Sequence, residues 1–346
     1  MIVHQFPDRT ITINQEKYLY FGGTSYLGLA TNKKFLKIIS KNIKKWGSSY
    51  GSSRSANIQV AAYESGEKTL ANYIKSEAAV TVSSGMLAGK IVIELLQQET
   101  AMFYHFPNSH HAIKAPNSLP FFVDGLMNPR LLDSTEEKIV LLSDSIPTSS
   151  VVPINLSYIE KIPTTKTITL VLDESHSLGI VGKNGCGLFS SIACANIQRK
   201  IMISSLGKAL GLTGGVIASD NEFIVNVKNL GSFVSAAGMA PAYVQSLRDG
   251  IGLVHKQHDK LMKNLTFLKS LIENNKSVVF HKKYPLLYPL PIDFHQTCLE
   301  NKLVIVHFKY ATLTGDLNRI VITANHKKKD LIQLAAVLNK NQSNLD

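Results

Sequence analysis

The sequence predicts an α/β protein in two parts: a large domain with a mainly parallel sheet, and a smaller α+β domain near the C-terminal end. Three observations support this prediction. Short apolar runs rich in β-branched residues alternate with helix-like segments through the middle of the chain. One long segment of helical period follows Pro241. Beyond Lys276 the pattern changes to two strand-like runs and a final amphipathic helix.

The strands expected in the large domain are short and nearly continuous in apolar residues, as in a sheet covered on both faces. Helical spacing of apolar residues predicts helices over residues 61–73 and 243–274. The small domain is expected to hold two strands and a closing helix. The predicted strands are residues 139–142, 167–172, 201–204 and 215–218 in the large domain, and residues 303–308 and 319–323 in the small one; the closing helix covers residues 329–338.

A chain of 346 residues exceeds a typical single domain, which also favours two parts. We expect the large domain over residues 45–240 and a linking helix over residues 241–275. The small α+β domain is expected over residues 276–346, with residues 1–44 packing on it.

Composition and charge exclude several classes of protein. No apolar run approaches the length of a membrane span, and the first ten residues lack the apolar core of a secretory signal. The three cysteines form no CxxC pair, which indicates a cytoplasmic protein without a disulfide framework. The net charge of +12 comes from scattered lysines that are not interleaved with aromatic residues. This pattern argues against nucleic-acid binding and is compatible with small phosphorylated ligands.

Two predicted strands end in residues that indicate chemistry. Residues 167–172 lead into Asp173, with His176 shortly after, and residues 201–204 lead towards Lys208. In open α/β sheets, ligands bind beyond the carboxyl ends of the strands. A carboxylate, an imidazole and an amine meeting there suit pyridoxal 5′-phosphate (PLP). Its aldehyde needs a lysine, its ring nitrogen an anionic partner, and its ring oxygen a hydrogen-bond donor.

Two segments resemble the α-oxoamine synthase family of fold-type I PLP enzymes. Residues 173–187 read DESHSLGIVGKNGCG and match the family pattern DEAHSxGxxGxxGxG except at Ser175. Residues 204–215 read SSLGKALGLTGG and are similar to GTLGKAxGxxGG, with serine at the first two positions. Weaker matches extend from about Phe21 to His326.

The resemblance implies four catalytic residues. Lys208 would form the Schiff base with PLP and act as general acid and base. Asp173 would pair with the pyridine nitrogen, and His176 would donate to the ring oxygen. His111 would stack on the ring, although the neighbouring His110 remains an alternative for this role. The histidines of this segment lack the HExxH spacing of a metal site, so no metal is expected.

Binding residues follow from the same resemblance. The sequence SGMLA at residues 84–88 fits the family segment whose amides hold the cofactor phosphate. An arginine of the small domain corresponds to the family's ligand for the substrate carboxylate. The residues implied are Ser84, Gly85, Met86 and Ser205 for the phosphate, Ser235 for the phosphate from a second subunit of a homodimer, and Arg319 for the substrate.

The resemblance implies a PLP-dependent acyltransferase that condenses a small amino acid with an acyl-CoA or another acyl thioester, with loss of CO₂. A pimeloyl donor would place the reaction in biotin synthesis. The family segments SMDGD and PPTVP have no clear counterpart at residues 145–152 and 308–315. Their absence leaves open an aminotransferase, aldolase or decarboxylase acting on a small amino acid. A degenerate homologue that serves as a partner protein is the third hypothesis.

Overall fold

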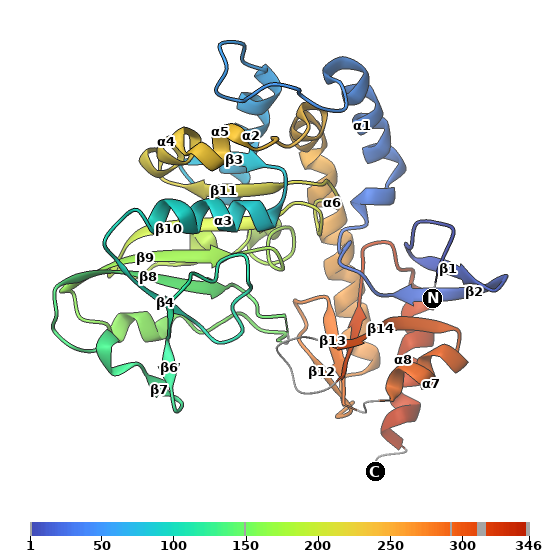
Figure 1. Ribbon diagram of the computed structural model, residues 1–346. Coiled ribbons are helices and arrows are strands. Elements are labelled where there is room, and N and C mark those ends of the chain that lie inside the picture. Colours follow the sequence, from blue (N-terminus) through green and yellow to red (C-terminus); the bar gives the residue numbers. More distant parts are fainter. Residues whose placement is uncertain (1, 149, 291–292, 310–315, 344–346) are drawn as a thin grey trace. The chain divides into compact units, whose positions relative to one another are not determined.

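The computed structural model describes residues 2–148, 150–290, 293–309 and 316–343. The chain forms two compact units (Figure 1). The larger unit is a single stretch, residues 33–252, and the smaller unit combines residues 1–32 with residues 253–346.

The larger unit is built on a seven-stranded sheet with the order β3–β11–β10–β9–β8–β4–β5. Strand β11 is antiparallel to both of its neighbours, and the other neighbouring pairs are parallel. This arrangement confirms the predicted mainly parallel sheet. The strands are β3 (Ala78–Val82), β4 (Met102–His105), β5 (Leu119–Pro120), β8 (Glu137–Asp144), β9 (Lys166–Asp173), β10 (Ile197–Ser205) and β11 (Gly215–Ser219), with a separate hairpin of β6 (Phe122–Val123) and β7 (Leu126–Met127).

Both faces of this sheet are buried, which explains why its strands are almost continuously apolar. Along β8, Val140 and Leu142 belong to one hydrophobic cluster, while Ile139 and Leu141 belong to another. The first cluster includes residues of three helices that cover that face. They are α3 (Gly85–Leu96), α4 (Asn221–Asn229) and α5 (Gly231–Ser235). A further helix, α2 (Ala61–Ile74), contacts β3.

The smaller unit holds a six-stranded mixed sheet with the order β1–β2–β14–β15–β13–β12. Residues from both ends of the chain build it, because β2 pairs in parallel with β14. Its elements are β1 (Thr10–Ile13), β2 (Glu16–Phe21), β12 (Val278–Phe280), β13 (Leu286–Pro289), β14 (Leu303–Lys309) and β15 (Asp316–Val321), with helices α7 (Phe294–Glu300) and α8 (Lys328–Ser343). The predicted α+β character of the C-terminal part is confirmed.

The unit boundaries differ from those expected from the sequence. Helix α1 (Lys33–Trp46) belongs to the larger unit, although residues 33–44 were grouped with the small domain. Its Phe35 is fully buried beside Gly250, and its Asn42 amide donates to Ser246 and Asp249. The long helix α6 (Pro241–Leu271) falls partly in each unit.

The parallel pairing of three strands prepares an edge of the large sheet for a ligand. In the registers of β8, β9 and β10, Asp144 lies opposite Asp173, and Asp173 lies opposite Ile203. The carboxyl ends of these strands therefore meet at one edge, where ligands bind in open α/β sheets. Helix α3 begins just after β3 ends. In the part of the chain that the structure describes, no helix is both long and apolar enough to cross a membrane.

Two glycines of α6 test the packing of α1. A Cβ at Gly250 would lie 2.5 Å from the buried ring of Phe35, whereas a Cβ at Gly252 would meet nothing within 4 Å. We expect Gly250→Ala to lower the free energy of unfolding by about 1–3 kcal/mol through overpacking. Gly252→Ala should raise it by about 0.5–1 kcal/mol, because alanine is the better helix former. Urea unfolding measures both. Equal effects of the two substitutions would contradict this packing.

Candidate functional site

A cavity of about 240 Å³ opens at the carboxyl ends of β8, β9 and β10 and at the start of α3. Seven of the ten residues predicted for the site line it. Its lining consists of Ser84, Gly85, Met86, His110, Ala112, Asp144, Asp173, Ser175, His176, Ser205 and Lys208. The sequence prediction that the two motifs meet at neighbouring strand ends agrees with this geometry.

The amine of Lys208 lies 2.9 Å from Nε2 of His176. Lys208 sits in a turn that follows β10. The backbone closes this turn twice, with hydrogen bonds from Leu206 to the carbonyl of Gly214 and from Leu212 to the carbonyl of Leu206. An amine held by a closed turn, with an imidazole in hydrogen-bonding contact, is suited to covalent and proton-transfer chemistry.

The carboxylate of Asp173 is buried at the end of β9 and accepts a hydrogen bond of 2.8 Å from the amide of Ser175. The hydroxyl of Ser175 in turn accepts the amide of Ser205 at 2.9 Å. Ser175 therefore joins the two motif segments, at the position where the family pattern has alanine. A buried carboxylate in such a place can pair with a cationic ring nitrogen.

The N-terminus of α3 forms the part of the cavity that is suited to an anion. Ser84 caps the helix, and its hydroxyl accepts the amide of Leu87. The first amides of a helix have no partner within the helix, so those of Gly85 and Met86 are available to a ligand. Glycine is needed here because a Cβ at Gly85 would lie 2.9 Å from the backbone of Ser205.

His110, rather than His111, lines the cavity. The side chain of His110 is half-buried, while His111 is exposed and its carbonyl accepts a hydrogen bond from Lys90. Two bonds fix the turn in this orientation. The amide of His110 donates to Oδ1 of Asp144 at 2.9 Å, and Nδ1 of His110 accepts the amide of Ala112 at 3.1 Å. Of the two histidines considered from the sequence, the turn thus brings His110 to the cavity, and which of them stacks on the ring stays a prediction.

Burial decides the charge of two groups in the cavity. It lowers the pKa of His110 below the usual value, although the carboxylate of Asp173 acts in the opposite direction. His110 is therefore neutral near pH 7. Burial, together with the carboxylate of Asp173, raises the pKa of Asp144 well above its usual range.

Behind the cavity, the side chain of Glu174 is fully buried and accepts several hydrogen bonds. The hydroxyl of Ser177 donates at 2.6 Å, and the amides of Leu188 and Phe189 donate at 2.8 and 2.6 Å. Burial nevertheless raises the pKa of Glu174 to about 7. Glu174 thereby ties the segment after the glycine-rich stretch to the end of β9, directly beside Asp173.

Two predicted residues lie elsewhere. Ser235 ends α5 and is exposed, so its assignment to the phosphate of a second subunit stays a prediction. Arg319 is buried on β15 of the smaller unit, and its role with the substrate also stays a prediction. The expected PPTVP counterpart at residues 308–315 lies mostly outside the described residues.

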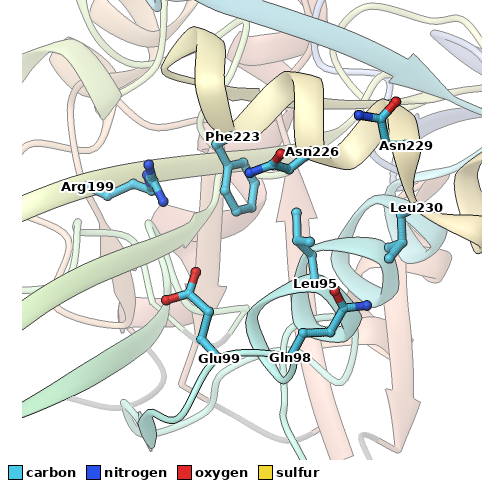
Figure 2. Close-up of a pocket in the computed structure, with 8 residues that line it drawn as sticks. All are labelled: Leu95, Gln98, Glu99, Arg199, Phe223, Asn226, Asn229 and Leu230. Atoms are coloured by element: carbon cyan, nitrogen blue, oxygen red, sulfur yellow. The ribbon is translucent and has the colours of Figure 1, made fainter.

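A larger cavity, of about 350 Å³, lies at the opposite end of β10, where Arg199 borders the ring of Phe223 (Figure 2). Its chemistry is less suited to catalysis. Arg199 is paired with Asp220 and Glu222, both at 2.8 Å, and the remaining polar lining is largely neutral amides. Within the described ranges, no group of three His, Cys, Asp or Glu side chains is arranged to hold a metal ion.

Sequence reasoning missed three residues of this region: Asp144, Glu174 and the bridging role of Ser175. Asp144 had a usable signal, since it ends an apolar run in the same way as Asp173. Glu174 was present inside the matched motif, but only the structure shows which amides it accepts.

Comparisons with known proteins agree with this geometry. The model of the family described as aminotransferase class I and II matches residues 131–338. The 8-amino-7-oxononanoate synthase of Lysinibacillus sphaericus is 23% identical over 361 residues, covering 95% of this chain and 90% of that protein. The serine palmitoyltransferase of Sphingobacterium spiritivorum is 24% identical over 275 residues, covering 76% and 69%.

Solved structures show the same fold. A serine palmitoyltransferase from S. paucimobilis, with a bound PLP–myriocin aldimine, superposes with a TM-score of 0.84 at 16% identity, covering 99% of this chain and 92% of that one. An 8-amino-7-oxononanoate synthase from Francisella tularensis gives a TM-score of 0.72 at 19% identity, covering 95% and 99%.

Glu174→Gln should alter how stability depends on pH. An acid whose folded-state pKa is raised favours the folded state most at low pH, and this contribution is lost as pH rises through its folded value of about 7. The free energy of unfolding should therefore fall by up to about 1.4 kcal/mol per pH unit towards pH 7 in the native chain. Glutamine should flatten this slope, as measured by urea unfolding without cofactor at pH 5.5, 6.5 and 7.5. The control Glu94→Gln, on an exposed part of α3, should leave the slope unchanged. An unaltered slope in Glu174→Gln would contradict the assignment.

Proposed function

Because the chain belongs to the aminotransferase class I and II family of PLP-dependent enzymes, and its named relatives include α-oxoamine synthases, we propose that it condenses a small amino acid with an acyl thioester. The observation that carries the proposal is the 2.9 Å contact between Lys208 and His176 in a cavity that also contains the buried carboxylate of Asp173.

The cavity fits PLP in three respects. The amides at the start of α3 suit the phosphate, because helix N-termini bind anions. The absence of a Cβ at Gly85 leaves room beside Ser205. Asp173 offers a buried negative charge for the ring nitrogen, and the amine of Lys208 offers the nucleophile for the aldehyde.

The residues of the chain then have separate tasks. Asp173 would hold the ring nitrogen protonated, and PLP, when bound, would withdraw electrons from the Cα atom of the substrate. His176 contacts the amine of Lys208 and would donate to the ring oxygen of PLP. His110, whose pKa is lowered by burial, would lie against the ring without adding a positive charge there.

Lys208 carries the proton transfers. Lys208, whose amine would hold the aldehyde of PLP in the resting enzyme, would take the Cα proton of the bound amino acid. A bond forms between Cα and the acyl carbon, the C–S bond of the thioester breaks, and the thiolate leaves and takes a proton from solvent. The carboxylate of the amino acid then departs as CO₂, the C–C bond electrons stay on Cα, and Lys208 returns to Cα the proton that it took from it.

The substrates follow from the same resemblance. The cavity of about 240 Å³ favours a small amino acid such as glycine, alanine or serine once the cofactor fills part of the site. Arg319 is proposed to bind the carboxylate of the amino acid. A pimeloyl donor would make the chain a biotin-pathway enzyme, and an acyl-CoA is the proposed form of the thioester. We also propose a homodimer in which Ser235 reaches the phosphate of the second subunit.

Absorption spectroscopy tests the cofactor assignment. The purified chain with PLP should show a band near the visible edge that borohydride abolishes, and peptide mass analysis should locate the reduced adduct on Lys208. Lys208→Ala should lack the band, because no amine is left to attack the aldehyde. The matched control Lys228→Ala, in the exposed last turn of α4, should keep it. A native chain without such a band would overturn the proposal.

The reaction itself is tested with glycine, L-alanine and L-serine, each with and without pimeloyl-CoA or palmitoyl-CoA. Thiol release and CO₂ release should be equal and should require both substrates. CO₂ release without a thioester would identify a decarboxylase instead, and formation of a keto acid would identify an aminotransferase.

The two adjacent histidines give a matched pair. His110→Ala should weaken PLP binding at least tenfold, because it removes the imidazole from the cavity. His111→Ala should change binding less than twofold, because that side chain is exposed. Equilibrium titration of the apo forms with PLP measures both. The reverse order would restore the choice that the sequence favoured.

A further inference from the structure

Asp144 is a buried carboxyl group in the cavity to which the proposed function gives no task. It is the last residue of β8 and lies opposite Asp173, the last residue of β9, in the parallel register. In parallel strands, residues in register lie on neighbouring strands about 4.8 Å apart and point to the same face. Both carboxyl groups line the cavity, and they are 5% and 6% exposed.

The end of β8 holds the turn that contains His110. The carbonyl of Leu142 accepts the amide of Phe106 at 2.9 Å and the hydroxyl of Ser109 at 3.1 Å. Two residues further along β8, Oδ1 of Asp144 accepts a hydrogen bond from the amide of His110 at 2.9 Å. Of these bonds, the one from Asp144 reaches the residue whose imidazole lines the cavity. Its loss would leave a partly buried amide without this acceptor and release the turn at that residue.

Two buried carboxyl groups at this separation cannot both be charged at low cost. The groups that face Asp144 are Asp173 from β9, His110 from the turn after β4, and Lys208 from the turn after β10. Asp173 has the amide of Ser175 as a donor to its carboxylate. Burial and the charge of Asp173 raise the pKa of Asp144, which favours the neutral acid at Asp144.

We propose that Asp144 is a positioning residue of the cofactor site, which holds His110 over the ring through its carbonyl oxygen while its carboxyl group remains protonated. Asp173 is then the single anion of the pair and the partner of the ring nitrogen. This inference rests on the proposed PLP site and adds to it the residue that orients the ring-covering imidazole.

The proposal separates the acceptor function of Asp144 from its charge. Asp144→Asn keeps a carbonyl oxygen and has the charge of the protonated acid, so PLP affinity should stay within threefold of the native chain from pH 6 to 8. Asp144→Ala removes the acceptor and should weaken PLP binding at least tenfold. It should also change the visible circular dichroism of bound PLP, which reports the setting of the ring.

A double-mutant cycle identifies the path of the effect. If Asp144 acts through His110, then Asp144→Ala should change PLP affinity less than threefold in a chain that already carries His110→Ala. Additive losses would overturn the proposal, because they would mean that Asp144 acts independently of the imidazole. A loss in Asp144→Asn as large as that in Asp144→Ala would overturn it too, since the negative charge would then be what matters.

Two controls keep the outcomes distinct. Thermal unfolding of each apo form shows whether a variant is folded, and Asp144→Leu, similar in size and unable to accept the amide, replaces the alanine variant if that one does not fold. A native chain that binds no PLP would refute the proposed function itself. A native chain that binds PLP, with Asp144→Ala and Asp144→Leu both unaffected, would refute only the role of Asp144.

Discussion

The parallel pairing of β8, β9 and β10 is the constraint on which the cavity depends. Because these strands run in the same direction and in register, their carboxyl ends meet at one edge of the sheet. That edge receives Asp144, Asp173 and the turn of Lys208 from three different strands. A strand displaced by one residue would turn its terminal side chain to the opposite face of the sheet and so away from the cavity. The strand register that buries apolar side chains on both faces of the sheet therefore also determines where the reactive side chains lie.

The polar residues behind the cavity make this edge rigid. Ser145 donates to the carbonyl of Asp173 and contacts the hydroxyl of Ser177, which in turn donates to Glu174. Glu174 accepts the amides of Leu188 and Phe189. A buried network is favourable only when its members are satisfied, and here its donors and acceptors are matched. The burial of this network also raises the pKa of the Glu174 carboxyl group to about 7 and so opposes its ionisation.

The fold and the centre of the site were accessible from the sequence, because both depend on regular periods. The apolar runs predicted four strands of the large sheet, and their ends located Asp173 and Lys208. The sequence could not decide between His110 and His111, because a turn has no regular repeat of apolar residues. The orientation of this turn depends on the hydrogen bond from the amide of His110 to Asp144. The boundary after residue 32 was missed for a similar reason. It depends on the contact of Phe35 with Gly250, which joins segments far apart in the chain.

The arrangement of charges in the cavity explains why the cofactor and the fold should depend on each other. PLP brings a phosphate and a ring nitrogen that is protonated beside a carboxylate, and the cavity offers the opposite partners: the start of α3 and Asp173. Without the cofactor, the buried side chain of Asp173 accepts a hydrogen bond from the amide of Ser175. A ligand that binds only the folded chain stabilises it by mass action. The start of α3 and Asp173, which would serve the reaction, therefore also make the folded chain bind a ligand that has an anionic end and a cationic ring. The overall charge of +12 cannot supply this selectivity, because it is spread over lysines throughout the sequence.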